Sequence, residues 1–135
     1  MTPEQISQVQ GSFAHVVPIA DQAADLFYDR LFELDPSLRP LFKDDLRAQK
    51  RALVGMLVIV VNGLDKLDTI VPAVERLGRR HASYGVRYAH YATVGSALLW
   101  TLEQGLGDRF QPQTREAWTA AFTLLADTMK AAARN

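Results

Sequence analysis

Cysteine is absent from this chain of 135 residues. Its absence excludes disulfide bonds, thiolate metal sites and cysteine nucleophiles. An excess of charge is also missing, because 15 lysines and arginines balance 15 aspartates and glutamates. Without a basic excess we expect neither nucleic acid nor an anionic membrane as a partner.

Long apolar runs are missing as well. The longest, over residues 52–61, has 10 residues and is too short to span a bilayer. The first segment, "MTPEQISQVQ", is polar and does not resemble a signal peptide, so we expect a cytoplasmic protein. With 48% apolar residues the chain can bury a sizeable core, which predicts a single domain over residues 1–135.

Apolar residues recur mainly at helical spacing, and no stretch alternates with period two for long. Thr2, Pro3 and Gln5 form a helix-start pattern, in which Thr2 caps and Gln5 completes a capping box. The predicted fold class is therefore all-α, with six or seven helices and short connections. The expected helices cover about residues 3–17, 18–34, 45–62, 70–84, 90–104 and 112–133, with a short turn over 37–42.

One predicted helix carries a histidine on its apolar side. At about 100° per residue, Ile70, Val74, Leu77 and His81 fall within roughly 60° of one another, with Arg80 at the edge. His81 can be a core histidine bonded to a backbone carbonyl, or a ligand that faces a cofactor. A lone histidine cannot hold zinc, which takes three or four protein ligands in structural and catalytic sites. Haem iron needs only one, because the porphyrin supplies four nitrogens.

Two further polar residues interrupt apolar faces on other helices. Gln49 is the only polar residue on the face that carries Leu53 and Met56, and Tyr28 lies between two phenylalanines. A buried amide and a buried hydroxyl need partners, which can be each other, a water or a bound ligand. Each residue alone is typical of ordinary core polarity. Together with an inward histidine on a third helix, they favour a ligand site.

Four segments, in their order and spacing, resemble a single-domain globin over nearly the whole chain. They are "LFYDRLFELDPSLRPLF", "LGRRHASYGV", "HYATVGSALLWTLEQGLG" and "AWTAAFTLLADTM". The chain is most similar to bacterial haemoglobins related to the haem domain of flavohaemoglobins, and its second half also resembles neuroglobin. This resemblance implies a globin fold, with three helices over three around a haem b. Gln49 lies only seven positions after Phe42, which leaves no room for a D helix.

The resemblance also implies roles for individual residues. His81 corresponds to the proximal histidine that binds iron, and its other ring nitrogen would bond a backbone carbonyl. Phe42 would pack against the porphyrin, Tyr28 and Gln49 would stabilise the bound gas, and Arg80 would lie near a haem propionate. The rest of the pocket would be lined by Leu53, Leu77, Val86, Tyr91, Val94 and Leu98.

One departure concerns a polar relay that the related haem domains place near the proximal histidine. Tyr91 fits the tyrosine of that relay, but alanines occupy positions 131–133, where the glutamate should fall. The relay is therefore incomplete, which counts against efficient oxygen activation.

Three functions follow from the resemblance. The first is reversible binding of oxygen, nitric oxide and carbon monoxide at a five-coordinate ferrous haem. The second is nitric-oxide dioxygenase activity, which needs a separate NAD(P)H-dependent reductase to reduce the iron again. The third is a gas or redox sensor module, including a globin-like interaction module without cofactor. The presence of His81, Phe42, Tyr28 and Gln49 together favours a haem protein.

Overall fold

A computed structural model of the protein describes residues 1–134. Over these residues the chain forms six α-helices, three short 3-10 helices and no strand, which confirms the predicted all-α class. The α-helices are α1 (Pro3–Val16), α2 (Ala20–Leu34), α3 (Arg47–Asn62), α4 (Leu67–Ser83), α5 (Tyr88–Leu106) and α6 (Pro112–Ala133). The 3-10 helices are η1 (Val17–Ile19), η2 (Pro36–Leu41) and η3 (Gly107–Arg109).

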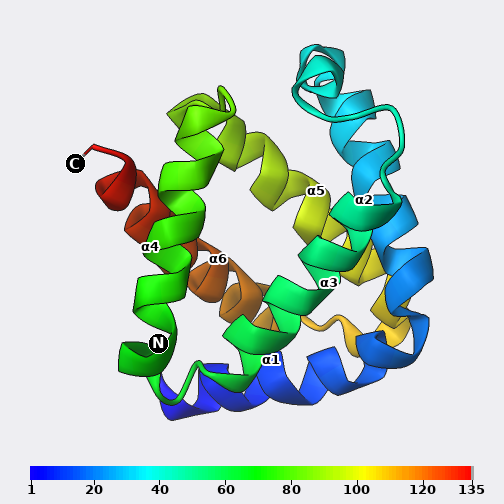
Figure 1. Ribbon diagram of the computed structural model, residues 1–135. Coiled ribbons are helices and arrows are strands. Elements are labelled where there is room, and N and C mark those ends of the chain that lie inside the picture. The colour runs from blue at the N-terminus through cyan, green and yellow to red at the C-terminus, as the bar shows by residue number, and fades with distance from the viewer. Residues whose placement is uncertain (135) are drawn as a thin grey trace.

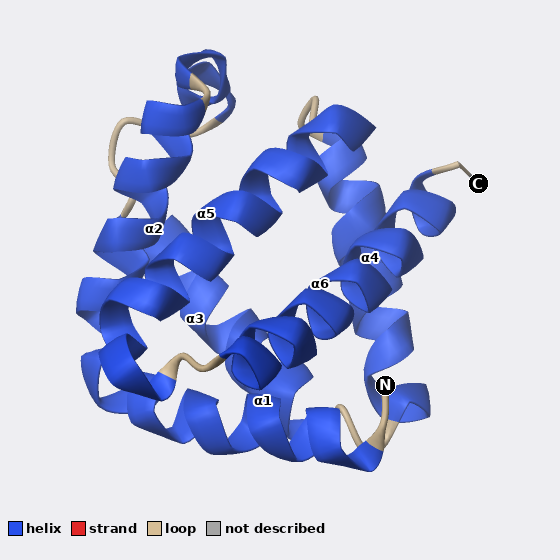
Figure 2. Ribbon diagram, turned by 180° about the vertical axis from the view of Figure 1, so that it is seen from behind, coloured by secondary structure: helices blue, strands red, loops and turns tan. Residues whose placement is uncertain are grey.

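The helices form the three-over-three arrangement that the sequence predicts. Helices α3 and α4 lie in front of α5 and α6 in Figure 1, and Figure 2 shows the same pairs from behind. Helix α2 packs against both α3 and α5, whereas α4 packs mainly against α6. Helix α1 crosses below and contacts α5 and α6 (Figure 1). Among the described residues, no helix is long and apolar enough to cross a membrane.

Local sequence signals set several helix ends. The Thr2 hydroxyl accepts a hydrogen bond from the Gln5 backbone N–H at 3.1 Å, and the Gln5 side chain accepts one from Thr2, which confirms the capping box. Gly85 follows α4 with a φ of 93°, a left-handed conformation that favours glycine. No helix lies between η2 and α3, as the short spacing predicts.

Other helix boundaries differ from the prediction because they depend on local contacts that periodicity does not reveal. Helix α4 begins at Leu67 rather than at residue 70, since Leu67 packs against the core and extends the apolar side. Helix α5 begins at Tyr88 rather than at residue 90, because His90 Nδ1 accepts the Arg87 backbone N–H at 2.9 Å. Helix α3 begins at Arg47, whose backbone N–H donates a hydrogen bond to the Asp45 carboxylate.

Helix α4 approaches α6 closely at Gly78. A Cβ added there would lie 2.5 Å from the Met129 carbonyl oxygen, and a backbone atom cannot easily move away. We expect Gly78→Ala to lower the free energy of unfolding by about 1–3 kcal/mol, measured by urea denaturation. Gly55→Ala is the matched control, because a Cβ there meets nothing within 4 Å. Equal losses of unfolding free energy in the two variants would show that the close approach of α4 to α6 does not limit the side chain at position 78.

Candidate functional site

The buried core is divided into two clusters, although a domain usually has one contiguous core. The first joins α1, α3, α4, α5 and α6; it includes Tyr91, and Leu77, Val86 and Leu98 pack against it. The second is centred on Phe27, Tyr28, Leu31, Leu38 and Ala97; Phe42, Leu53, Val94 and Leu98 pack against it. Of the apolar residues predicted to line a pocket, all but Tyr91 are only half-buried. These residues, which the resemblance expects to line an apolar slot for the haem, therefore keep apolar surface that neither core cluster covers.

Helix α4 presents His81 on the predicted apolar side. Ile70 and Val74 are buried, whereas Leu77 and His81 are half-buried. Burial lowers the pKa of His81, and the positive charge of Arg80 lowers it further. The imidazole is therefore neutral at neutral pH, with a lone pair available to a metal.

The His81 ring forms no hydrogen bond with any residue from 1 to 134. Both interpretations, the core histidine and the iron ligand, expected a backbone carbonyl partner for this ring, so the absence of that bond does not separate them. The half-buried position leaves part of the ring uncovered, which suits a ligand that faces a cofactor.

The side chains of Tyr28, on α2, and Gln49, on α3, are in contact. Gln49 Nε2 donates to the Tyr28 hydroxyl oxygen at 3.0 Å, so the amide of an otherwise exposed residue turns inward. Tyr28 is only 3% exposed, and burial raises the pKa of its hydroxyl more than the Gln49 bond lowers it. Of the three partners that the sequence left open, the structure shows the two residues bonded to each other.

This arrangement leaves the Tyr28 proton without an acceptor. The Gln49 amide is the donor in their bond, so the Tyr28 O–H is still available to donate. No residue in the described part of the chain accepts it. Buried hydroxyls normally find a partner, so this group fits a bound molecule that has an acceptor atom.

The raised pKa of Tyr28 has a consequence at alkaline pH. Ionising this hydroxyl is harder in the folded protein, so its contribution to stability is complete below pH 10.0 and is lost as the pH rises through the higher folded value. We expect Tyr28→Phe to gain stability relative to the parent above pH 10.0, measured by urea unfolding of both proteins. A difference that does not change across this pH range would contradict the buried hydroxyl.

Three aromatic rings fix the orientation of Tyr28. The Phe27 ring meets it edge-on with centroids 5.0 Å apart, and the Phe42 ring does so at 5.7 Å. Phe32 lies against both Tyr28 and Phe42. Phe42 and Tyr28, which the sequence assigned to one pocket, are therefore in direct contact.

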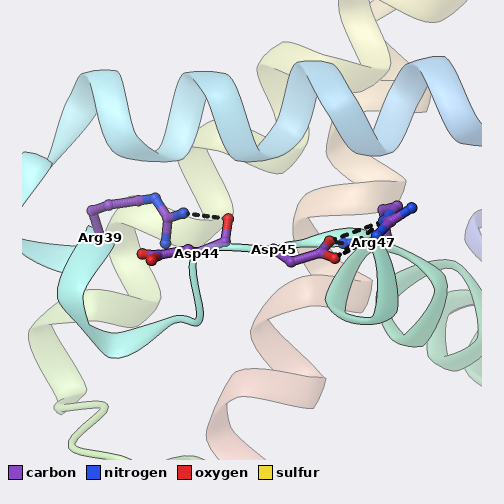
Figure 3. A network of polar contacts seen from close by, with 4 residues as sticks. All are labelled: Arg39, Asp44, Asp45 and Arg47. Atoms are coloured by element: carbon purple, nitrogen blue, oxygen red, sulfur yellow. Dashed lines mark hydrogen bonds and ion pairs between the residues drawn. The ribbon is translucent and has the colours of Figure 1, made fainter.

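Arg39 organises the loop that carries Phe42. Its guanidinium donates to the Asp44 carbonyl oxygen (Figure 3) and to that of Lys43, both at 2.9 Å, and more weakly to the Phe42 carbonyl. Further along the same loop, Arg47 pairs with Asp45 at 2.7 Å (Figure 3). Sequence reasoning missed Arg39, because an arginine that bonds backbone carbonyls leaves no periodic signal.

A small apolar cavity is lined by residues of both clusters. Its volume is about 30 Å³, and Leu53, Leu98 and Trp118 are among its lining residues. Its polar side chains already have partners: the Thr101 hydroxyl donates to the Ala97 carbonyl and the Trp118 indole N–H donates to the Ser12 hydroxyl, both at 2.8 Å. The cavity therefore offers a small molecule no free hydrogen-bond donor, in contrast to Tyr28.

On the side of the first cluster, Tyr91 is buried as the resemblance implies. The Lys130 ammonium lies 5.5 Å from the centroid of its ring. Positions 131–133 are alanines, so the carboxylate of the predicted relay is absent there, and the charged group over the Tyr91 ring is a cation. Arg80 is exposed beside His81, and its pairing with a propionate stays a prediction.

Comparison with known proteins identifies the family to which this fold belongs. The sequence model of the Globin family matches residues 25–129. The chain belongs to the globin family. This globin is 32% identical to a flavohemoprotein of Bacillus subtilis over 118 residues, which are 82% of this chain and 30% of that protein. It is 35% identical to a flavohemoprotein of Bordetella parapertussis over 106 residues, 76% of this chain and 26% of that protein. The chain therefore spans less than a third of these two relatives.

Solved structures share the fold over almost the whole chain. A bacterial globin from Campylobacter jejuni matches with a TM-score of 0.83 and 23% identity, covering 98% of this chain and 96% of that one. A hexacoordinated heme protein from a tardigrade matches with a TM-score of 0.90 and 15% identity, covering 100% and 96%. An engineered carbene transferase from Rhodothermus marinus matches with a TM-score of 0.90 and 22% identity, covering 99% and 94%.

Membership of the globin family implies a haem cofactor and the binding of diatomic gases. The fold alone does not fix the sixth position of the iron, because the tardigrade protein of the same fold is hexacoordinated. The coordination state of this globin therefore depends on its own residues around the site.

Proposed function

We propose that this globin binds haem b in the slot between the two core clusters and reversibly binds oxygen, nitric oxide and carbon monoxide. The haem would supply an iron that takes one axial ligand from the protein and a gas molecule on the opposite side. The neutral, unpaired His81 is the axial ligand. The half-buried residues Phe42, Leu53, Leu77, Val86, Val94 and Leu98 enclose the ring.

The observation that carries this proposal is the unmet hydrogen-bond donor of Tyr28. Gln49 donates to the Tyr28 oxygen and so directs the phenol proton elsewhere, toward an acceptor such as a bound gas. Tyr28, Gln49 and Lys50 all have partners within the protein, so none of them is free to bind iron. The sixth position is therefore open in the reduced protein, which we place in the cytoplasm.

Gas titration of the reduced, haem-loaded protein tests the proposal. We expect oxygen and carbon monoxide each to bind reversibly, with one gas molecule per chain and spectra that return on removal of the gas. A protein that takes up haem but binds neither gas would contradict it. A protein that stays colourless with ample haem would favour the interaction module instead.

A second candidate is nitric-oxide dioxygenase activity with a separate NAD(P)H-dependent reductase. The buried Tyr91 favours it, because the resemblance makes this residue part of an oxygen-activating relay. The alanines at positions 131–133 and the Lys130 ammonium over the same ring argue against it, since the relay would need a carboxylate there. Sustained NADH-dependent consumption of nitric oxide with a cellular reductase would establish the activity. A gas or redox sensor module would use the same pocket without turnover.

A further inference from the structure

A second polar contact joins α2 to α3 beside the bond between Tyr28 and Gln49. The Lys50 ammonium lies 2.8 Å from the Asp25 carboxylate. Asp25 and Tyr28 are three residues apart and therefore share one face of α2, while Gln49 and Lys50 are neighbours in the first turn of α3. The two contacts therefore bridge the same short segments of the two helices.

From this juxtaposition we infer that Asp25 and Lys50 are positioning residues for the gas site. Their ion pair holds the first turn of α3 against α2, and so keeps the Gln49 amide on the Tyr28 oxygen. The inference rests on the proposed gas binding and assigns a role to two residues outside the pocket.

The start of α3 is held mainly by local bonds and by one partly buried residue. Asp45 accepts the Arg47 backbone N–H, Arg39 donates to carbonyls of the preceding loop, and Leu46 packs against the second cluster. The buried residues of α3 among those described are Val60 and Val61, near its opposite end. Helix ends with few buried contacts are among the parts of a fold that open most readily. The beginning of α3 therefore depends on its contacts with α2.

The exposure of the Asp25 and Lys50 side chains indicates that their ion pair restrains the first turn of α3 only modestly. The Lys50 side chain is 28% exposed, against 83% for Arg47 on the same turn, so its stem is covered by protein. The Asp25 side chain is 61% exposed, so water and salt screen the pair in part. Gln49 is itself exposed, and its side chain can turn to solvent when the helix moves.

Loss of the ion pair should release the Gln49 amide and leave the Tyr28 hydroxyl free to rotate away from the gas. We expect Asp25→Asn and Lys50→Gln each to speed oxygen release by about two- to fivefold, in line with the strength of partly exposed ion pairs. Added salt should speed release from the parent in the same way, and should have little effect on either variant.

A double-mutant cycle on the haem-loaded protein tests the inference. The readouts are the oxygen dissociation rate and the infrared C–O stretch of the carbonyl form, which reports hydrogen bonding at the gas and does not respond to general stability. The double variant should release oxygen no faster than either single variant. The charge swap Asp25→Lys with Lys50→Asp should restore the parent C–O band. Arg115→Gln provides a control, because it breaks the Glu103–Arg115 pair on α5 and α6.

Additive effects, or an unchanged C–O band in both single variants, would overturn the inference. A low-spin ferric spectrum in Asp25→Asn alone would also overturn it, because the freed Lys50 would then be binding iron. Tyr28→Phe, measured in parallel, separates the two proposals. If Tyr28→Phe speeds release and the Asp25 and Lys50 variants do not, only the positioning role fails. If Tyr28→Phe also has no effect, the proposed role of Tyr28 in gas binding fails.

Discussion

Replacing Tyr28 with phenylalanine is expected to speed oxygen release by about ten- to a hundredfold. The variant keeps the ring and its aromatic contacts but removes a buried donor for which the described chain provides no acceptor. A hydrogen bond to a partly charged acceptor contributes about 1.5–3 kcal/mol, which corresponds to this change in rate. Stopped-flow displacement of oxygen by carbon monoxide measures it directly.

The effects of Gln49 and a control tyrosine complete the Tyr28 experiment. Gln49→Leu should speed release less than Tyr28→Phe, because the phenol proton remains and only its orientation is lost. Tyr84→Phe removes the same atom from a side chain that is 61% exposed, and should leave the rate unchanged. Equal oxygen release from the parent and Tyr28→Phe would show that Tyr28 is not the donor.

Replacing His81 with alanine is expected to remove the axial ligand while leaving the slot intact. Even outer partners of metal ligands contribute about 10–100-fold to metal affinity, so loss of the ligand itself should speed haem loss by about a hundredfold or more. Transfer of haem to an excess of an apoglobin measures the rate. Added imidazole should restore the axial bond and slow the loss, because it can occupy the space that the side chain leaves.

His90→Ala is the matched control for that experiment. His90 is also half-buried, but its Nδ1 accepts a hydrogen bond from the Arg87 backbone N–H at the start of α5. The lone pair of that nitrogen is therefore not available to a metal. We expect this variant to keep haem at the rate of the parent. Haem retention that His81→Ala does not change, or that imidazole cannot rescue, would contradict the proximal assignment.

Helical periodicity alone could place His81, Tyr28 and Gln49 correctly on their helices. Each is a polar residue within a local run of apolar residues at helical spacing. In a helix, residues at that spacing lie on the same face, so the local sequence shows which face carries the polar residue. The same reasoning found the apolar stripe from Ile70 to His81, which is buried or half-buried throughout. The resemblance then brought these faces into one pocket, and the shared core cluster of Tyr28 and Phe42 agrees with it.

Contacts between distant segments could not be predicted in this way. The Arg39 bonds to the loop carbonyls and the position of Lys130 over Tyr91 depend on how the helices pack. Nothing in the sequence distinguishes Lys50, which pairs with Asp25, from the exposed Arg47 three residues before it.

The absorption spectrum of the reduced protein without gas tests the central claim most directly. The structure pairs Gln49 with Tyr28 and Lys50 with Asp25, so the proposed site would take a single axial ligand, His81, from the described residues. We predict a five-coordinate, high-spin spectrum with one broad visible band, which His81→Ala abolishes. A six-coordinate, low-spin spectrum with two sharp visible bands would show that a second side chain occupies the gas site, and would contradict the account.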